Sequence, residues 1–146
     1  MRNILHIRGE ERMGTNLARI AEVVKNRPKE KLQTLVHHIN ADTLKEKHRE
    51  MAGDKAVGVD GMTKAEYHEN LDPNIEELMD RMKRQAYKPQ AVRRTHIPKP
   101  GSTKMRPLGI PSYEDKLVQG VMADILNTIY EPVFLAQFIY LRPSVA

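Results

Sequence analysis

Apolar residues recur at the spacing of an α-helix in two stretches of the N-terminal third. The first stretch runs from Thr15 to Pro28, where proline cannot continue a helix. The second stretch runs from about Lys29 to Met51. Residues 1–14 show no clear period, so we expect a loose start. The apolar positions of the two predicted helices are Leu17, Ile20, Val23, Val24, Leu32, Leu35, Val36, Ile39 and Leu44.

A glycine loop and a pair of helices are predicted next. Three glycines fall within the nine positions 53–61, which is typical of a loop with unusual backbone angles. Thr63–Glu66 has the spacing of a capping box, so we expect a helix to begin at Lys64. Asp72–Pro73 has the chemistry of another helix start, with Asp as N-cap and proline in the first helical position. This helix is expected to end near Tyr87.

Proline then excludes helix from a short segment. Five of the nine prolines lie in residues 89–111. The stretches Ala91–Ile97 and Lys104–Ile110 are predicted to be extended strands, joined by a turn at residues 101–103. A two-stranded hairpin is marginally stable alone, so it must pack on the helices or on something missing from this chain.

The last helix carries the broadest apolar stripe. Ser112–Asp115 supplies capping chemistry at its start, and Pro132 is expected to end it. The stripe consists of Leu117, Val118, Val121, Met122, Ile125, Leu126 and Ile129. Together the elements predict a mostly helical α+β fold, with helices around a short basic two-stranded hairpin.

Composition excludes several classes of protein. The chain has 146 residues, with 40% hydrophobic and 29% charged, and its mean hydropathy is −0.59. No apolar run is long enough to span a membrane, and the N-terminus lacks the sustained apolar stretch of a secretory signal. The absence of cysteine excludes a disulfide scaffold, a thiolate zinc site and a cysteine nucleophile. We expect a cytoplasmic protein, which fits the lack of cysteine.

The basic excess is concentrated in one window of 24 residues, from Lys83 to Arg106. It contains eight basic residues and no acidic residue, whereas the rest of the chain has 16 basic and 19 acidic residues. The basic residues are Lys83, Arg84, Lys88, Arg93, Arg94, Lys99, Lys104 and Arg106. A local field of one sign attracts polyanions, of which nucleic acid is the commonest. A solvated basic surface without a ligand is the alternative interpretation.

Three other patterns have simpler explanations than chemistry. Gly53 and Gly58 have phosphate-loop spacing, but the Lys and Ser/Thr of that motif are missing, so a turn is favoured. His37–His38 and His48 lack a third metal ligand at a convincing offset, which favours a helix surface. Glu114–Asp115 could hold a metal, but acidic residues in a first helical turn are explained by capping.

The hairpin turn is the most informative feature. Lys99 and Arg106 flank it, so their side chains can reach a common anion from adjacent strands. Prolines in the flanks stiffen the hairpin and reduce the entropy lost when a phosphate is bound. We therefore expect phosphate binding there, with generic surface charge as the alternative.

Several motifs resemble a known family. The runs Tyr87–Pro100, Arg106–Pro111 and Glu114–Lys116 resemble the fingers region of group II intron reverse transcriptase/maturases. Lys55–Gly61 resembles the loop that precedes it, and Ile129–Phe134 resembles the end of the helix that follows. The resemblance extends from about Thr15 to Phe134, with the motifs in order.

The resemblance implies an RNA-directed DNA polymerase that also helps its intron RNA to fold and splice. It implies that Lys99 and Arg106 bind the phosphates of a nucleotide. The residues implied to bind intron RNA or an RNA template are Lys88, Arg93, Arg94 and Lys104. Mg²⁺ is expected for the full-length family enzyme, and no cofactor is expected for this chain.

The sequence also departs from the family pattern. It stops before the palm aspartates, and Phe138–Pro143 stands where the family typically has Ser-Tyr-Gly-Phe-Arg-Pro. We therefore expect a truncated fingers segment that is inactive alone. The predicted division is a loose N-terminus (1–14), a helical extension with the glycine loop (15–61), a fingers-like segment (62–134) and a divergent tail (135–146).

Two alternatives to this function remain open. One is a non-functional remnant that self-associates through surfaces that the missing palm would cover. The other is an independent small nucleic-acid-binding protein, although no recognition-helix motif is evident.

Overall fold

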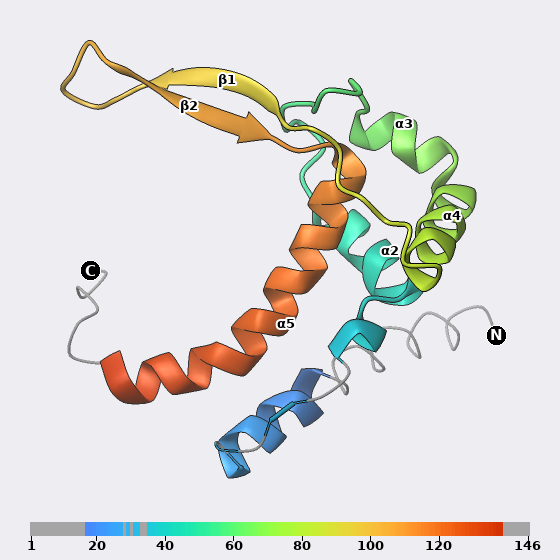
Figure 1. Cartoon of the computed structure of the whole chain (residues 1–146), viewed down its shortest axis with the longest axis vertical. Helices are drawn as coiled ribbons and strands as arrows, with labels where there is room; N and C mark the ends of the chain where they lie inside the picture. The colour runs from blue at the N-terminus through green and yellow to red at the C-terminus, as the bar shows by residue number, and fades with distance from the viewer. Residues whose placement is uncertain (1–16, 28, 30, 33–34, 139–146) are drawn as a thin grey trace. The chain divides into compact units, whose positions relative to one another are not determined.

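The computed structural model describes residues 17–27, 29, 31–32 and 35–138, so the predicted loose start and the last eight residues lie outside the described part. A helix covers residues 17–26. The other elements are η1 (Leu35–His38), α2 (Ala41–Glu50), α3 (Lys64–Glu69), α4 (Leu71–Lys83), β1 (Arg93–Pro98), β2 (Met105–Ile110) and α5 (Tyr113–Phe138) (Figure 1). The predicted mostly helical α+β class with a two-stranded hairpin is confirmed.

The chain divides into two compact units, which we describe separately. The first unit consists of residues 1–43 and 120–146, and the second consists of residues 44–119. The predicted division into four segments followed sequence motifs, whereas these units are defined by contacts. The four segments therefore stay a prediction. None of the helices in the described part has the length and apolar character that a bilayer crossing requires.

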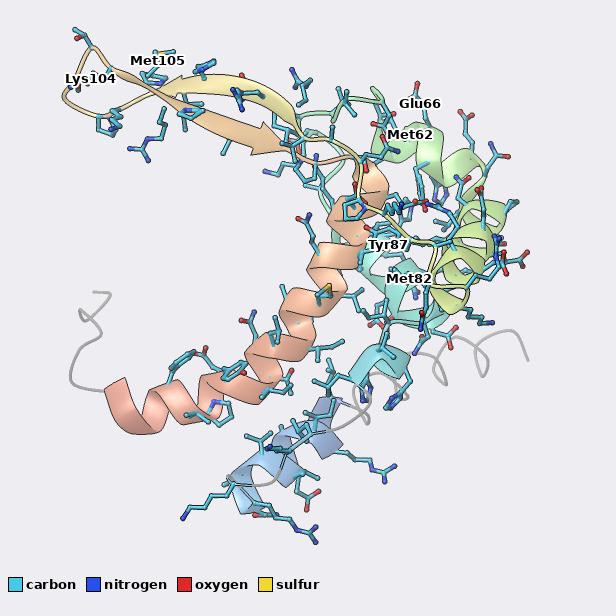
Figure 2. The ribbon with its side chains drawn as sticks, viewed as in Figure 1. Met62, Glu66, Met82, Tyr87, Lys104 and Met105 are labelled. Atoms are coloured by element: carbon cyan, nitrogen blue, oxygen red, sulfur yellow. The ribbon has the colours of Figure 1, made fainter. Side chains whose placement is uncertain are left out.

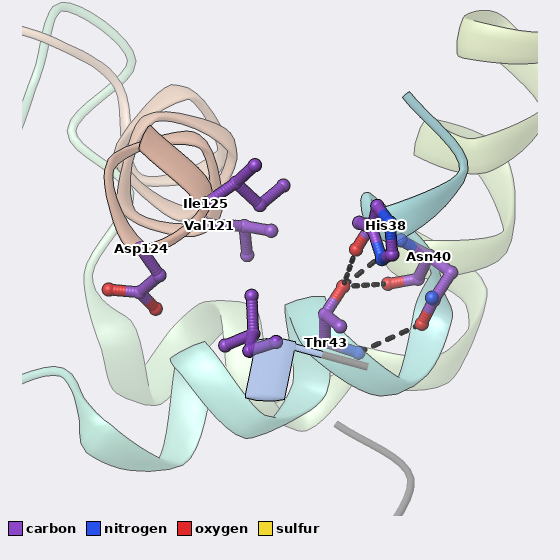
Figure 3. A pocket seen from close by; sticks show the side chains of 7 residues that line it. His38, Asn40, Thr43, Val121, Asp124 and Ile125 are labelled. Atoms are coloured by element: carbon purple, nitrogen blue, oxygen red, sulfur yellow. Dashed lines mark hydrogen bonds between the residues drawn. The ribbon is translucent and has the colours of Figure 1, made fainter. Parts of the chain in front are cut away.

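In the first unit, the predicted helix between Thr15 and Pro28 is confirmed over residues 17–26. The single helix predicted from Lys29 to Met51 is wrong, because η1 and α2 are separate elements. Asn40 accounts for the break: its Oδ1 accepts a hydrogen bond from the backbone N–H of Thr43 at 3.1 Å, and Thr43 Oγ1 accepts one from the N–H of Asn40 at 3.0 Å. These two bonds begin α2 (Figure 3).

Helix α5 was predicted to end at Pro132, but it continues to Phe138. Proline removes one backbone donor and favours a kink, and the ribbon of α5 bends toward its C-terminal end (Figure 1). The predicted apolar stripe is buried at Leu117, Val118, Val121 and Ile125. The prediction that the whole stripe lies in the core is wrong at Met122 and Leu126, which are nearly half exposed.

In the second unit, α3 begins as predicted. Thr63 Oγ1 accepts a hydrogen bond from the N–H of Glu66, and the Glu66 carboxylate accepts one from the N–H of Thr63 at 2.8 Å. The next start is wrong by two residues, because α4 begins at Leu71 and Asp72 lies within its first turn. The unit's core consists of Leu44, Tyr67, Ile75, Leu78, Ile110, Tyr113, Leu117 and Val118.

Helix α4 ends at Lys83 rather than near Tyr87. The N–H of Ala86 donates to the carbonyl of Arg81, and the N–H of Gln85 donates to the carbonyl of Met82. This pair of bonds forms a Schellman motif, and Gln85 occupies its left-handed position with φ of 55°. The motif therefore ends α4 about four residues before the predicted end near Tyr87.

The predicted hairpin is confirmed to within two residues at each strand end. Strands β1 and β2 pair antiparallel, with Ile97 opposite Arg106. The N–H of Lys99 donates to the carbonyl of Lys104, so these two residues form a hydrogen-bonded pair. Along the strands from this pair, non-hydrogen-bonded and hydrogen-bonded pairs alternate. In this register Pro98 and Pro107 belong to non-hydrogen-bonded pairs, in which a backbone N–H would point away from the partner strand. They therefore leave the ladder intact and remove a donor from each open edge.

The glycine loop at residues 53–61 packs against the start of α5. A Cβ atom on Gly58 would lie 2.7 Å from the carbonyl oxygen of Pro111 and 2.7 Å from the Cα of Ser112. The Lys116 ammonium donates a hydrogen bond to the carbonyl of Ala56. The favoured interpretation of Gly53 and Gly58 as a turn is confirmed, and close packing explains the second glycine.

Candidate nucleic-acid interface

One face of the hairpin carries four cations. Because side chains alternate along a strand, residues 93, 95, 97 and 99 share a face with residues 104, 106, 108 and 110 of the partner strand. We call Arg93, Lys99, Lys104 and Arg106 the cationic face. The sequence reasoning expected Lys99 and Arg106 to be neighbours, and the register makes them diagonal neighbours. Lys104, which the family resemblance assigned to RNA binding, lies directly opposite Lys99.

The cationic face is exposed. Lys99, Lys104 and Arg106 all lie in the solvent-exposed part of the hairpin, and Figure 2 shows Lys104 and Met105 at its turn end. Within the described part of the chain, no carboxylate lies at ion-pair distance from these three residues. Like charges gathered without counterions repel one another, so an anion would relieve an unfavourable field.

The remaining predicted site residues are dispersed. Arg94 lies on the opposite face of the hairpin with His96, and Lys88 lies in the exposed segment before β1. Arg93 belongs to the cationic face, but its Nε donates to the carbonyl of Val57 at 2.9 Å. That bond ties the hairpin to the glycine loop. The predicted binding roles of all six residues stay predictions.

Apolar side chains accompany the cations. Ile97 and Leu108 on the cationic face are exposed, and so is Met105 on the opposite face. The hairpin has no Phe, Tyr or Trp on which a nucleobase could stack. The surface is therefore suited to contacts with a phosphate backbone rather than to reading a sequence.

The acidic doublet at the start of α5 is built into the packing of the second unit. Glu114 accepts hydrogen bonds from Arg81 at 2.5 Å and from the Tyr67 hydroxyl at 3.2 Å. Burial, followed by the nearby Glu114 carboxylate, raises the pKa of Tyr67 well above its usual range. The explanation by capping alone is wrong for Glu114, because its partners come from α3 and α4.

Asp115 faces a different set of partners. The residue is 3% exposed, and its carboxylate accepts hydrogen bonds from the Tyr87 hydroxyl at 2.5 Å and from the N–H of Gln90 at 2.8 Å. Capping does contribute, because Ser112 Oγ accepts from the N–H of Asp115 at 3.3 Å and donates to its carboxylate at 2.8 Å. Gln90 and Tyr87 lie 25 and 28 residues before Asp115, so no local pattern in the sequence predicts these two bonds.

The sequence pattern favoured a position on a helix surface for His48. In the structure His48 is buried instead. It is 1% exposed, its Nδ1 lies 2.7 Å from the Tyr113 hydroxyl, and its Nε2 lies 2.9 Å from His68 Nδ1. Burial lowers the pKa of His48 below its ordinary value, and neighbouring Lys64 and His68 add to the effect. Among the described residues, no three His, Cys, Asp or Glu side chains converge as metal ligands.

The chain is similar to curated proteins over part of its length. Over 63 residues the chain is 49% identical to the group II intron-encoded protein LtrA of Lactococcus lactis subsp. cremoris, and equally to that of strain MG1363. The similarity to a group II intron-encoded protein is confirmed. Over 92 residues the chain is 35% identical to protein YkfC of Escherichia coli (strain K12).

These matches cover only parts of the proteins compared. The LtrA match covers 43% of this chain and 10% of LtrA, and the YkfC match covers 63% of this chain and 24% of YkfC. No protein-family model matches the chain. The chain therefore corresponds to a small part of each relative.

Proposed function

We propose that this chain is the fingers part of a group II intron-encoded reverse transcriptase/maturase and binds RNA and nucleotide phosphate through its hairpin. The observation that carries the proposal is the exposed cationic face, on the hairpin whose motifs resemble that family. Lys99 and Arg106 would bind nucleotide phosphate. Lys88, Arg93, Arg94 and Lys104 would bind intron RNA or an RNA template. A cytoplasmic location belongs to the same proposal.

Binding would act through the phosphate backbone. Arg presents a planar fork of donors to a phosphate, and Lys presents a point charge. The hydrogen-bonded ladder and the prolines would hold these cations in place before RNA arrives, which reduces the entropy lost on binding. Without an aromatic platform, the hairpin would accept many RNA sequences.

The chain would not polymerise DNA by itself. Nucleotide transfer in the family requires metal ions held by palm carboxylates, with Mg²⁺ supplied to the full-length enzyme. The carboxylates found here do not fit that task. Asp115 accepts three hydrogen bonds from the protein, and Glu114 is held by Arg81 and Tyr67. The chain would contribute binding and positioning instead.

A salt titration of RNA binding tests the proposal. Of the six proposed binding residues, Arg93 makes a side-chain hydrogen bond to the carbonyl of Val57, which leaves five cations to contact phosphate, namely Lys88, Arg94, Lys99, Lys104 and Arg106. If all five contact phosphate, the plot of log affinity against log salt for single-stranded RNA has a slope of about −3.5. The double variant Lys99→Glu/Arg106→Glu should bind more weakly, with a slope shallower by about 1.4.

A matched variant separates local contacts from net charge. Lys25 and Lys55 are exposed and lie outside the basic window. Lys25→Glu/Lys55→Glu changes the net charge equally and should keep most of the affinity and the slope. Equal losses in both double variants, or an affinity independent of salt, would overturn the proposal.

Exposed side chains of α5 favour self-association as a second candidate. Met122, Leu126, Tyr130 and Phe134 repeat every four residues and are about half exposed. A stripe of this kind is a liability in a soluble monomer. Light scattering over a range of protein concentrations tests it: a monomer throughout, with well-protected amides, would reject the self-associating remnant.

A further inference from the structure

A single buried carboxylate holds both ends of the hairpin. Tyr87 and Gln90 precede β1, and Ser112 lies two residues after the end of β2. All three donate to Asp115 in the first turn of α5, at 2.5, 2.8 and 2.8 Å respectively. Figure 2 shows Tyr87 on the segment between α4 and β1, and Lys104 at the turn end of the hairpin.

The hairpin has few other restraints on its direction. Ile110 is buried in β2, whereas every other strand residue is exposed or only partly buried. The bond from Arg93 to the carbonyl of Val57 is exposed, and Gly58 packs at the base rather than along the strands. Small angular changes at the base would therefore become large displacements of Lys99 and Lys104.

We propose that Asp115 is a positioning residue that clasps the two ends of the hairpin and so sets the direction in which the cationic face points. This inference rests on the proposed function only for its consequence, which is tighter RNA binding. Capping of α5 needs Ser112 alone. The bonds from Tyr87 and Gln90 cross to another part of the chain and have no role in beginning the helix.

The carboxylate is chemically required for the clasp. Three donors converge on its two oxygens, and an amide in its place would direct an N–H₂ group toward at least one of them. The Tyr87 hydroxyl lies in a partly buried place, where burial and its bond to Asp115 raise the pKa of the phenol well above its usual range. The phenol therefore remains a donor across the neutral range.

Distances between two labels measure the direction of the hairpin. The chain has no cysteine, so Thr103→Cys in the turn and Gln119→Cys on α5 give two unique labelling sites, both exposed. Electron spin resonance of the doubly labelled protein should give a narrow distance distribution. Tyr87→Phe keeps the ring and removes one bond of the clasp, so the distribution should broaden. Asp115→Asn should broaden it further.

A matched control and a second readout separate the clasp from general stability. Tyr130→Phe makes the same chemical change at an exposed tyrosine outside the clasp and should leave the distribution unchanged. In the unlabelled protein, Tyr87→Phe should weaken binding of single-stranded RNA about threefold to tenfold, which corresponds to loss of one hydrogen bond. Tyr130→Phe should not weaken it.

The outcomes are distinguishable even if Asp115→Asn fails to fold, because Tyr87→Phe retains the packing of the ring. A distribution that stays narrow in folded Tyr87→Phe protein would overturn the clasp. If the distribution broadens but the parent protein binds no RNA, the clasp stands and the proposed function fails. If RNA binds equally well to the parent and a broadened variant, the clasp has no consequence for binding and the inference is overturned.

Discussion

Gln85 adopts a backbone conformation that glycine adopts more readily. Its φ of 55° places it in the left-handed region at the end of α4, where a side chain costs about 1 kcal/mol. Its side chain is exposed, so little packing is lost on its removal. We predict that Gln85→Gly raises the free energy of unfolding by about 0.5–1 kcal/mol, as measured by urea denaturation.

A neighbouring substitution provides the control for Gln85. Lys83 is the last residue of α4 and has helical geometry. Lys83→Gly should therefore lower the free energy of unfolding by up to about 1 kcal/mol. A loss of stability in Gln85→Gly similar to that in Lys83→Gly would show that the left-handed conformation does not strain Gln85.

The buried His48 should make stability depend on pH. Its pKa is lowered in the folded protein, whereas the unfolded chain has the ordinary value of about 6.5. Below pH 6.5 the unfolded state binds more protons, so the free energy of unfolding should fall as the pH is lowered from 6.5 to 5. The limiting slope for one group is about 1.4 kcal/mol per pH unit.

Replacing His48 isolates its contribution to that slope. The groups around it are Lys64, His68, Tyr67 and Tyr113, and burial raises the pKa of Tyr113 to about 12. None of these is changed in His48→Gln. The variant should be less stable at pH 7.5 but lose less stability on acidification, as urea midpoints at several pH values would show. Parallel curves for the two proteins would contradict the prediction.

At the scale of elements, the glycine loop depends on one close approach. A methyl group on Gly58 would lie within 2.8 Å of the backbone of Pro111 and Ser112, so the start of α5 would have to move. We predict that Gly58→Ala lowers the free energy of unfolding by about 1–3 kcal/mol. Gly53→Ala is the control, because the nearest atom is Lys64 Cδ at 3.8 Å. Equal denaturation midpoints for the two variants would refute the packing role.

Elements with strong local signals were predictable, and those fixed by distant partners were not. The capping box at Thr63 and the hairpin around Gly101, whose φ is 71°, follow from nearby residues. The break at Asn40 was missed because the apolar period continues across it, although asparagine favours the N-cap position. Pro132 was expected to end α5, but the helix continues on both sides of the lost hydrogen bond.

The same distinction applies to the candidate site. Sequence alone located the basic window and the strands that carry it, because charge and proline content are local properties. Strand register then decided which cations share a face, and it separated Arg94 from Lys99. The partners of Asp115 could not be predicted, because they meet it only after the segments before and after the hairpin are brought together.

At the scale of the whole molecule, charge and burial are unevenly distributed. The window of residues 83–106 carries all of the basic excess, and the rest of the chain has a net charge of −3. Among the described residues, the most completely buried large side chains all lie in residues 44–119. They are Leu44, Ile75, Leu78, Leu117, His48 and Ser112. The unit that presents the cationic face therefore also contains the best-packed core.

This distribution predicts unequal resistance to local opening. Amides of α4 should exchange with solvent only through large-scale unfolding, whereas those of residues 17–26 should exchange through smaller openings, because Ile20 is less completely buried than Leu78. Native-state hydrogen exchange at low denaturant measures both. Leu78→Ala should lower the opening free energy of α4 by about 2–5 kcal/mol, and Ile20→Ala should leave it unchanged. Equal protection of both helices in the parent protein, with both falling together in Ile20→Ala, would mean that the chain unfolds as one cooperative unit.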